Sequence, residues 1–140
     1  MAIVARYLID TSAAARAGHP EVARRLGQLI TAGLVATCAP LDFEALYSAR
    51  SPAEYDEVRA DRALAYENVP THDVDWGTAL EIQSRLARQG QHRSVGMADL
   101  LVAAIAERER LTVLHYDRDF DVIGAITGQH TDWVVPAGSV

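Results

Sequence analysis

Three short apolar runs, separated by longer segments of helical periodicity, constrain the fold of this chain most strongly. The runs are residues 6–9 (RYLI), 34–38 (LVATC) and 111–115 (LTVLH). Each run is too short for a helix and is expected to be a buried strand. Strands that alternate with helices form a parallel sheet covered by helices. The pattern therefore predicts an α/β fold, a three-layer α/β/α sandwich with a mainly parallel central sheet.

The segments between these strands carry helix start and stop signals. Thr11 and Ser12 can cap an alanine-rich helix that is expected to reach residue 18. Ser51, followed by Pro52 and by Glu54 three positions on, predicts a capping box. Residues 96–110 are apolar enough to predict a largely buried helix. The other expected helices are residues 20–32, 40–49, 75–89 and 119–126, and the other expected strands are 68–70 and 133–135.

Length and composition predict one domain in a reducing compartment. The 140 residues suit a single domain, 1–140, with a core of its own. The single cysteine, Cys38, cannot form an internal disulfide, so we expect a cytoplasmic protein. The first residues lack the pattern of a signal peptide, and no stretch approaches the roughly 20 apolar residues of a membrane span. No membrane association is expected.

The charge balance excludes several function classes. The net charge of −6 argues against a protein that binds nucleic acid by bulk attraction. A carboxylate site filled with divalent cations would nevertheless reverse its local sign. All 13 basic residues are arginine. Because a P-loop, a phospho-accepting receiver domain and a haloacid-dehalogenase-type phosphatase each need a lysine, the sequence excludes these mechanisms.

Acidic residues recur at the ends of strands and the starts of helices. Asp10 follows the first strand, and Asp117 and Asp119 follow the strand at 111–115; Glu44 and Asp99 lie one turn into helices. Ligands of open α/β sheets bind beyond the carboxyl ends of the strands, so these acids are expected to share one edge. Each also has a simpler interpretation: Asp10 as a helix cap, Glu44 as a solvated position, Asp99 as a first-turn acid, and Asp117 and Asp119 as turn residues.

A divalent metal ion explains why such acids would gather. Mg²⁺ prefers oxygen ligands and is held by one or a few carboxylates, whereas packed carboxylates without a cation repel one another. Metal-assisted phosphodiester hydrolysis uses this arrangement. The acidic positions therefore predict a divalent metal site of the kind that phosphodiester hydrolysis uses.

Four blocks of the sequence resemble a known family. YLIDTSA, LDFEALYSA, GMADLLVAAIAE and LTVLHYDRDFDVI are similar to the acidic blocks of PIN domains, in particular of the VapC toxins of bacterial toxin–antitoxin pairs. The resemblance runs from residue 7 to residue 135. It implies a PIN-like domain that cuts RNA endonucleolytically with Mg²⁺ or Mn²⁺. It also implies a homodimer and a cognate antitoxin whose tail occupies the active-site groove.

The resemblance also implies roles for individual residues. Asp10 and Asp99 would be the principal metal ligands, and Glu44 a further ligand or a residue that orients the attacking water. Asp117 would be the fourth catalytic acid, with Asp119 as a metal ligand or a helix cap beside it. Supporting hydrogen bonds to the acids or to a water would come from Thr11 or Ser12.

Two other functions are consistent with parts of the pattern. A catalytically silent PIN-like scaffold would bind RNA or protein without cutting, but such a scaffold would be expected to lack some of the acids. A phosphatase with an aspartate nucleophile is suggested by LIDTS, but it would need an acid where Ser12 stands. Arg50, Arg93 and Arg118 are candidates for gripping RNA phosphates or for plain surface roles.

Overall fold

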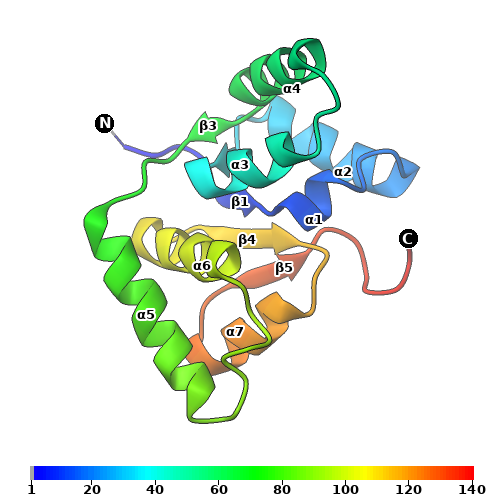
Figure 1. Cartoon of the computed structure of the whole chain (residues 1–140). Coiled ribbons are helices and arrows are strands. Elements are labelled where there is room, and N and C mark those ends of the chain that lie inside the picture. The colour runs from blue at the N-terminus through cyan, green and yellow to red at the C-terminus, as the bar shows by residue number, and fades with distance from the viewer. Residues whose placement is uncertain (1) are drawn as a thin grey trace.

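The computed structural model describes residues 2–140 and contains a central five-stranded sheet (Figure 1). The strand order is β3-β2-β1-β4-β5, and every neighbouring pair is parallel. The predicted parallel α/β architecture is therefore confirmed. The strands are β1 (Tyr7–Ile9), β2 (Val35–Thr37), β3 (Glu67–Asn68), β4 (Thr112–His115) and β5 (Thr131–Trp133).

Seven helices are described around this sheet. They are α1 (Thr11–Ala14), α2 (Pro20–Thr31), α3 (Ala39–Tyr47), α4 (Pro52–Ala65), α5 (Asp73–Ala87), α6 (Met97–Glu109) and α7 (Asp119–Thr127). Within residues 2–140, no helix has the length and hydrophobicity that crossing a bilayer requires.

Successive strand residues point to opposite faces, and each face has its own core. Leu8 and Val113 face a core formed with α3, α5, α6 and α7, whereas Ile9 and Leu114 face a core formed with α1 and α2. All four side chains are fully buried. This two-sided burial explains why the strands read as continuous apolar runs rather than as alternating patterns.

The prediction of a long helix after Asp10 was wrong. α1 ends at Ala14, and Arg16 N–H donates to the Ala13 carbonyl in a turn. In a continuing helix that N–H would bond the Ser12 carbonyl, which instead accepts from the Arg16 side chain at 2.8 Å. Pro20 then disfavours helical backbone at His19, whose φ and ψ are −82° and 132°. The helix therefore cannot run on into α2.

Small shifts occur at other boundaries. β3 is Glu67–Asn68 rather than residues 68–70, and β5 is Thr131–Trp133 rather than 133–135. The cap at Ser51 is confirmed, since its side chain accepts from Glu54 N–H at 3.1 Å. The Glu54 carboxylate bonds the N–H of Arg50 instead of that of Ser51, so the reciprocal half of the capping box is missing.

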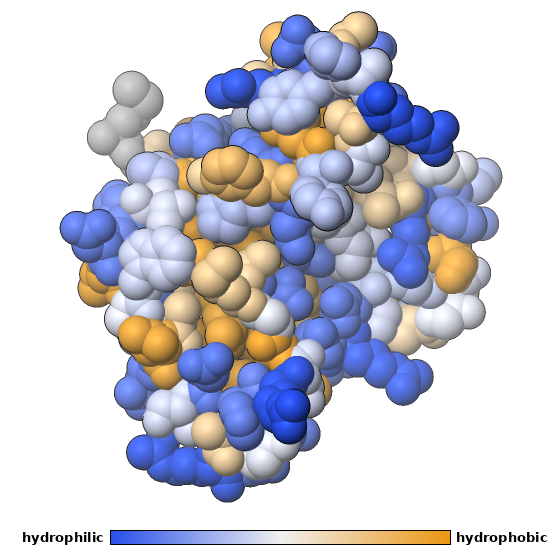
Figure 2. All heavy atoms as spheres, in the orientation of Figure 1, coloured by the Kyte–Doolittle hydropathy of each residue, from blue (hydrophilic) through white to orange (hydrophobic). Residues whose placement is uncertain are grey.

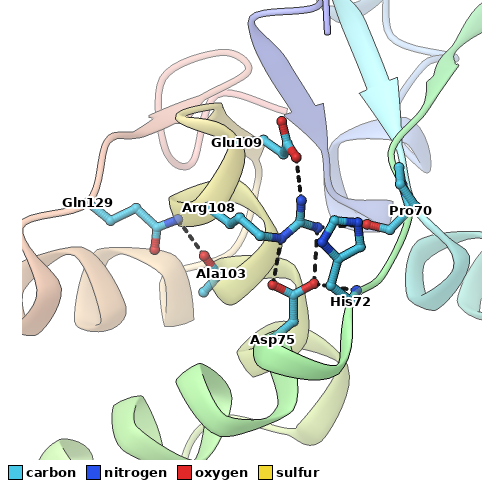
Figure 3. Close-up of polar contacts among 7 residues, drawn as sticks. All are labelled: Pro70, His72, Asp75, Ala103, Arg108, Glu109 and Gln129. Atoms are coloured by element: carbon cyan, nitrogen blue, oxygen red, sulfur yellow. Dashed lines mark hydrogen bonds and ion pairs between the residues drawn. The ribbon is translucent and has the colours of Figure 1, made fainter. Parts of the chain in front are cut away.

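A buried ion pair joins the start of α5 to the end of α6 (Figure 3). The Asp75 side chain is 1% exposed and accepts from Arg108 Nε and Nη2 at 2.9 and 3.0 Å. Asp75 also accepts from His72 N–H, while Arg108 donates to the Pro70 carbonyl and to Glu109. Burial raises the pKa of the Asp75 carboxyl, but the hydrogen bonds from Arg108 and His72 outweigh it, so the pKa lies below its usual value.

Candidate active site

Asp10 lies at the carboxyl end of β1 and is 3% exposed. It is the N-cap of α1: its Oδ2 accepts from Ser12 N–H at 3.0 Å and from Ser12 Oγ at 2.5 Å. The capping role therefore uses one carboxylate oxygen only. The other, Oδ1, is buried and has no hydrogen-bond partner within the described residues. A buried carboxylate oxygen without a partner costs free energy, which a bound cation would offset.

Ser12 connects the ends of the two central strands. Its Oγ donates to Asp10 and accepts from Tyr116 N–H at 2.9 Å. Because β1 and β4 are neighbouring parallel strands, residues that follow both of them meet at one edge of the sheet. The single hydroxyl therefore fixes the loop that carries Asp10 relative to the loop that carries Asp117.

Asp99 is half-buried in the first turn of α6. Residues 100–106 of this helix are all buried, which fixes the helix against the sheet and α5. Burial, and then the negative charges of Asp10, Glu44, Asp117 and Asp119, raise the pKa of Asp99 to about 7. A carboxyl with this pKa carries its proton in a large fraction of molecules at neutral pH, unless a cation holds it in the charged form.

Glu44 extends from α3 to the exposed side of the same cluster. Thr11 Oγ1 donates to its Oε1 at 3.3 Å. Partial burial, followed by the charge of Asp10, raises the pKa of Glu44. Thr11 thus orients Glu44, and Ser12 orients Asp10. Each of the two hydroxyls that were predicted to support the acids therefore contacts an acid of the cluster.

Asp117 and Asp119 complete the cluster after β4. Asp117 Oδ1 accepts from Asp119 N–H at 2.9 Å, so Asp117 forms the turn that starts α7. Burial and the charge of Asp117 raise the pKa of Asp119. In the described residues, oxygens of Asp10, Glu44 and Asp99 lie within 4.8 Å of one another, and so do oxygens of Asp99, Asp117 and Asp119. The five acids therefore meet at one place, and Asp99 belongs to both groups.

His115, the last residue of β4, supports the loop that carries Asp117. Its side chain is fully buried, and its Nδ1 accepts from Asp117 N–H at 3.1 Å. The ring packs against Phe120 and Trp133, with centroid distances of 5.2 and 5.0 Å. Burial lowers the pKa of His115, which keeps the acceptor nitrogen unprotonated. The sequence gives no signal for this contact, since a histidine at a strand end reads only as a packed residue.

The three arginines considered from the sequence are exposed and lie outside the described ion pairs. Arg118 lies between Asp117 and Asp119, and its exposed side chain leaves it free to meet a ligand. For Arg50 and Arg93 no contact with the acids is seen in residues 2–140. Arg16 was not predicted as a site residue, and it contacts both Ser12 and Tyr116 beside the acids.

The arrangement fits a divalent cation. Oxygen ligands from five carboxylates, one buried oxygen without a partner and a carboxyl with a pKa near neutrality are together the properties of a site built for a hard cation. Without a cation, these groups repel one another.

Comparisons with known protein families and with individual proteins agree with one another. The PIN domain family matches residues 7–126. Ribonuclease VapC21 of Mycobacterium tuberculosis is 46% identical over 134 residues, covering 96% of this chain and 97% of that protein. Ribonuclease VapC18 of the same organism is 40% identical over 136 residues, covering 96% and 98%.

Solved structures of the same fold include toxin–antitoxin complexes. VapBC2 from Rickettsia felis, bound to a DNA fragment from its promoter, has a TM-score of 0.75 at 16% identity and covers 90% of this chain and 96% of that chain. DNA-bound VapBC from Salmonella typhimurium has a TM-score of 0.75 at 18% identity and covers 94% and 100%. At these identities the likeness is one of fold.

Proposed function

Because this chain belongs to the PIN-domain family and, within it, to the VapC ribonucleases, we propose that it is the endoribonuclease toxin of a toxin–antitoxin pair. Its substrate is RNA, and the reaction is metal-dependent hydrolysis of a phosphodiester bond. The observation that carries the proposal is the meeting of Asp10, Glu44, Asp99, Asp117 and Asp119 at one edge of the sheet. The complete acid set favours this function over a catalytically silent scaffold.

Asp10 and Asp99 would be the principal metal ligands, with Asp117 and Asp119 completing the set. Mg²⁺ or Mn²⁺, when bound, supplies Lewis-acid activation of water and compensation of the negative charge on the phosphodiester. Ser12 bonds both Asp10 and the N–H of Tyr116, which follows β4. It thereby orients the ligands before the cation binds. We propose that Glu44, which accepts a hydrogen bond from Thr11 at the exposed side, takes a proton from the attacking water.

The experiment is cleavage of RNA by the purified protein with Mg²⁺ or Mn²⁺, with and without EDTA. We expect cutting that requires the metal and that stops in Asp10→Asn, which removes one carboxylate charge at the buried oxygen without a partner. We also expect millimolar metal to raise the melting temperature, because ligand binding to the folded state stabilises it. RNA binding without metal-dependent cutting would support the scaffold instead.

The partners are proposed from exposed apolar surfaces. Figure 2 shows hydrophobic side chains on the face formed by α3, α5 and α6. The large exposed apolar residues of these helices are Phe43, Tyr47, Val74, Trp76, Leu80 and Met97. Patches of this kind mark protein interaction sites, so we propose that the α5 and α6 part of this face, with Val74, Trp76, Leu80 and Met97, forms a homodimer.

A second surface suits the antitoxin. A cavity of about 450 Å³ between α3 and α4 is lined partly by Leu46, Tyr55 and Tyr66. Phe43 lines the same cavity and is 75% exposed. A groove with aromatic walls suits an apolar peptide segment, so we propose that the antitoxin binds there. We also propose a cytoplasmic location, with which the buried, unpaired Cys38 is consistent. We propose that residues 1–140 act as one domain.

A further inference from the structure

Arg16 is an ordered cation beside the acid cluster. It follows α1 and is half-buried. Its Nη1 donates to the Ser12 carbonyl at 2.8 Å, and its guanidinium carbon lies 4.2 Å from the centre of the Tyr116 ring. These two contacts hold the end of a side chain that is otherwise among the most flexible in proteins.

The two residues that hold Arg16 are the ones that connect the acid loops. Ser12 follows Asp10 by two positions and donates to its carboxylate, and Tyr116 directly precedes Asp117. Ser12 and Tyr116 are themselves joined by the hydrogen bond from Tyr116 N–H. The guanidinium is therefore anchored to both strand ends that carry the acids.

The charge of Arg16 is not neutralised within residues 2–140. Arg25, Arg62 and Arg108 each form an ion pair, whereas no carboxylate of the described chain lies within 4.0 Å of Arg16. Its described hydrogen bonds also use only Nη1, so most of its N–H donors are free. A fixed arginine with free donors matches the geometry of an anionic oxygen pair such as a phosphate.

We propose that Arg16 binds a backbone phosphate of the RNA strand next to the scissile bond, an inference that rests on the proposed ribonuclease function. The chain carries a net charge of −6, so an incoming strand needs local positive charge near the acids. Arg16 supplies that charge from a side chain that already contacts Ser12 and Tyr116, so less conformational entropy is lost when RNA binds. One face of the Tyr116 ring is covered by Arg16, so a base cannot stack on that face.

The test measures binding of a short fluorescein-labelled single-stranded RNA by anisotropy, in an Asp99→Asn background so that the probe stays intact. Salt is varied between about 50 and 200 mM. Loss of one phosphate contact reduces the slope of log Kd against log salt by about 0.7. We expect Arg16→Gln to show this loss and to weaken binding about 10-fold or more. Arg16→Lys keeps the point charge, so it should retain the slope and bind with intermediate strength.

The matched control is Arg6→Gln, an exposed arginine at the opposite end of β1 from Asp10. It should leave both the slope and the affinity unchanged. In otherwise wild-type protein, Arg16→Gln should raise KM with little change in kcat, the signature of lost substrate binding rather than of a damaged metal site. Suppose that the wild-type protein cuts RNA and that Arg16→Gln has the same salt slope and affinity as Arg6→Gln. This result would overturn the inference about Arg16 and leave the proposed function standing. A wild-type protein that neither binds nor cuts RNA would remove the proposed function as well.

Discussion

Replacing Asp99 with asparagine is expected to lower RNA cleavage by about 10³-fold, because a ligand shared by both acid groups is lost and metal stabilisation of the transition state amounts to several kcal/mol. The same substitution should stabilise the metal-free protein at pH 8. The pKa of Asp99 is raised to about 7 from its usual 3.8, so the folded state holds the proton more tightly than the unfolded state. Stability is therefore lost as the pH rises from about 4 to 7, and asparagine avoids this loss.

After allowance for solvent screening of a half-buried group, Asp99→Asn should raise the free energy of unfolding of the metal-free protein at pH 8 by about 1–2 kcal/mol. This corresponds to about 3–8 °C in melting temperature. The measurement is thermal unfolding in EDTA at pH 5 and pH 8, then with saturating Mg²⁺. With saturating Mg²⁺ the wild-type protein should have the higher melting temperature of the two, because only the wild-type protein keeps its full ligand set. Asp56→Asn, at an exposed position on α4, is the matched control and should change neither stability nor cleavage. An Asp99→Asn protein that cuts RNA at the wild-type rate would remove this residue from the mechanism.

The second large effect concerns folding rather than cleavage. Asp75→Ala is expected to lower the free energy of unfolding by about 2–3 kcal/mol, since Arg108 loses its two hydrogen bonds to a buried carboxylate but keeps those to Glu109 and to the Pro70 carbonyl. The measurement is urea unfolding at pH 7. Because the pKa of the Asp75 carboxyl is lowered, its stabilisation is present at neutral pH and lost as the pH falls below about 4. The difference between variant and wild type should therefore shrink in acid.

Asp73→Asn is the control for Asp75→Ala, because Asp73 is an exposed acid in the same first turn of α5. It should cost only a few tenths of a kcal/mol through the helix dipole. Arg108 is nine residues after Asp99, about 13 Å along α6. Molecules of Asp75→Ala that remain folded at 25 °C should therefore still cut RNA, and a loss of activity per folded molecule would show that the ion pair also shapes the active site.

The sequence was sufficient to predict the layers of the fold and the gathering of the acids. Both depend on features that neighbouring residues encode: apolar runs that end at an acid, and an aspartate inside the apolar helix at 96–110. Parallel strands then bring their carboxyl ends together, so distant acids such as Asp10 and Asp117 meet without any further signal.

The sequence was not sufficient for contacts that depend on side-chain direction. At the end of the short α1, the Ser12 carbonyl accepts from the Arg16 side chain and the Arg16 N–H bonds the Ala13 carbonyl, a pattern that no local propensity reveals. The pairing of Asp75 with Arg108 joins two helices across 33 positions. His115 could not be connected with Asp117 N–H, because a strand-end histidine has the same pattern whether or not it supports a site.

The central claim is that five acids far apart in the chain form one pocket for a divalent cation. The most direct measurement is anomalous diffraction from a crystal of the wild-type protein soaked in Mn²⁺. We predict an anomalous peak about 2.0–2.2 Å from carboxylate oxygens of Asp10 and Asp99, and no such peak in Asp99→Asn crystals. A Mn²⁺-soaked wild-type crystal with these carboxylates clearly ordered and no peak between them would contradict the claim.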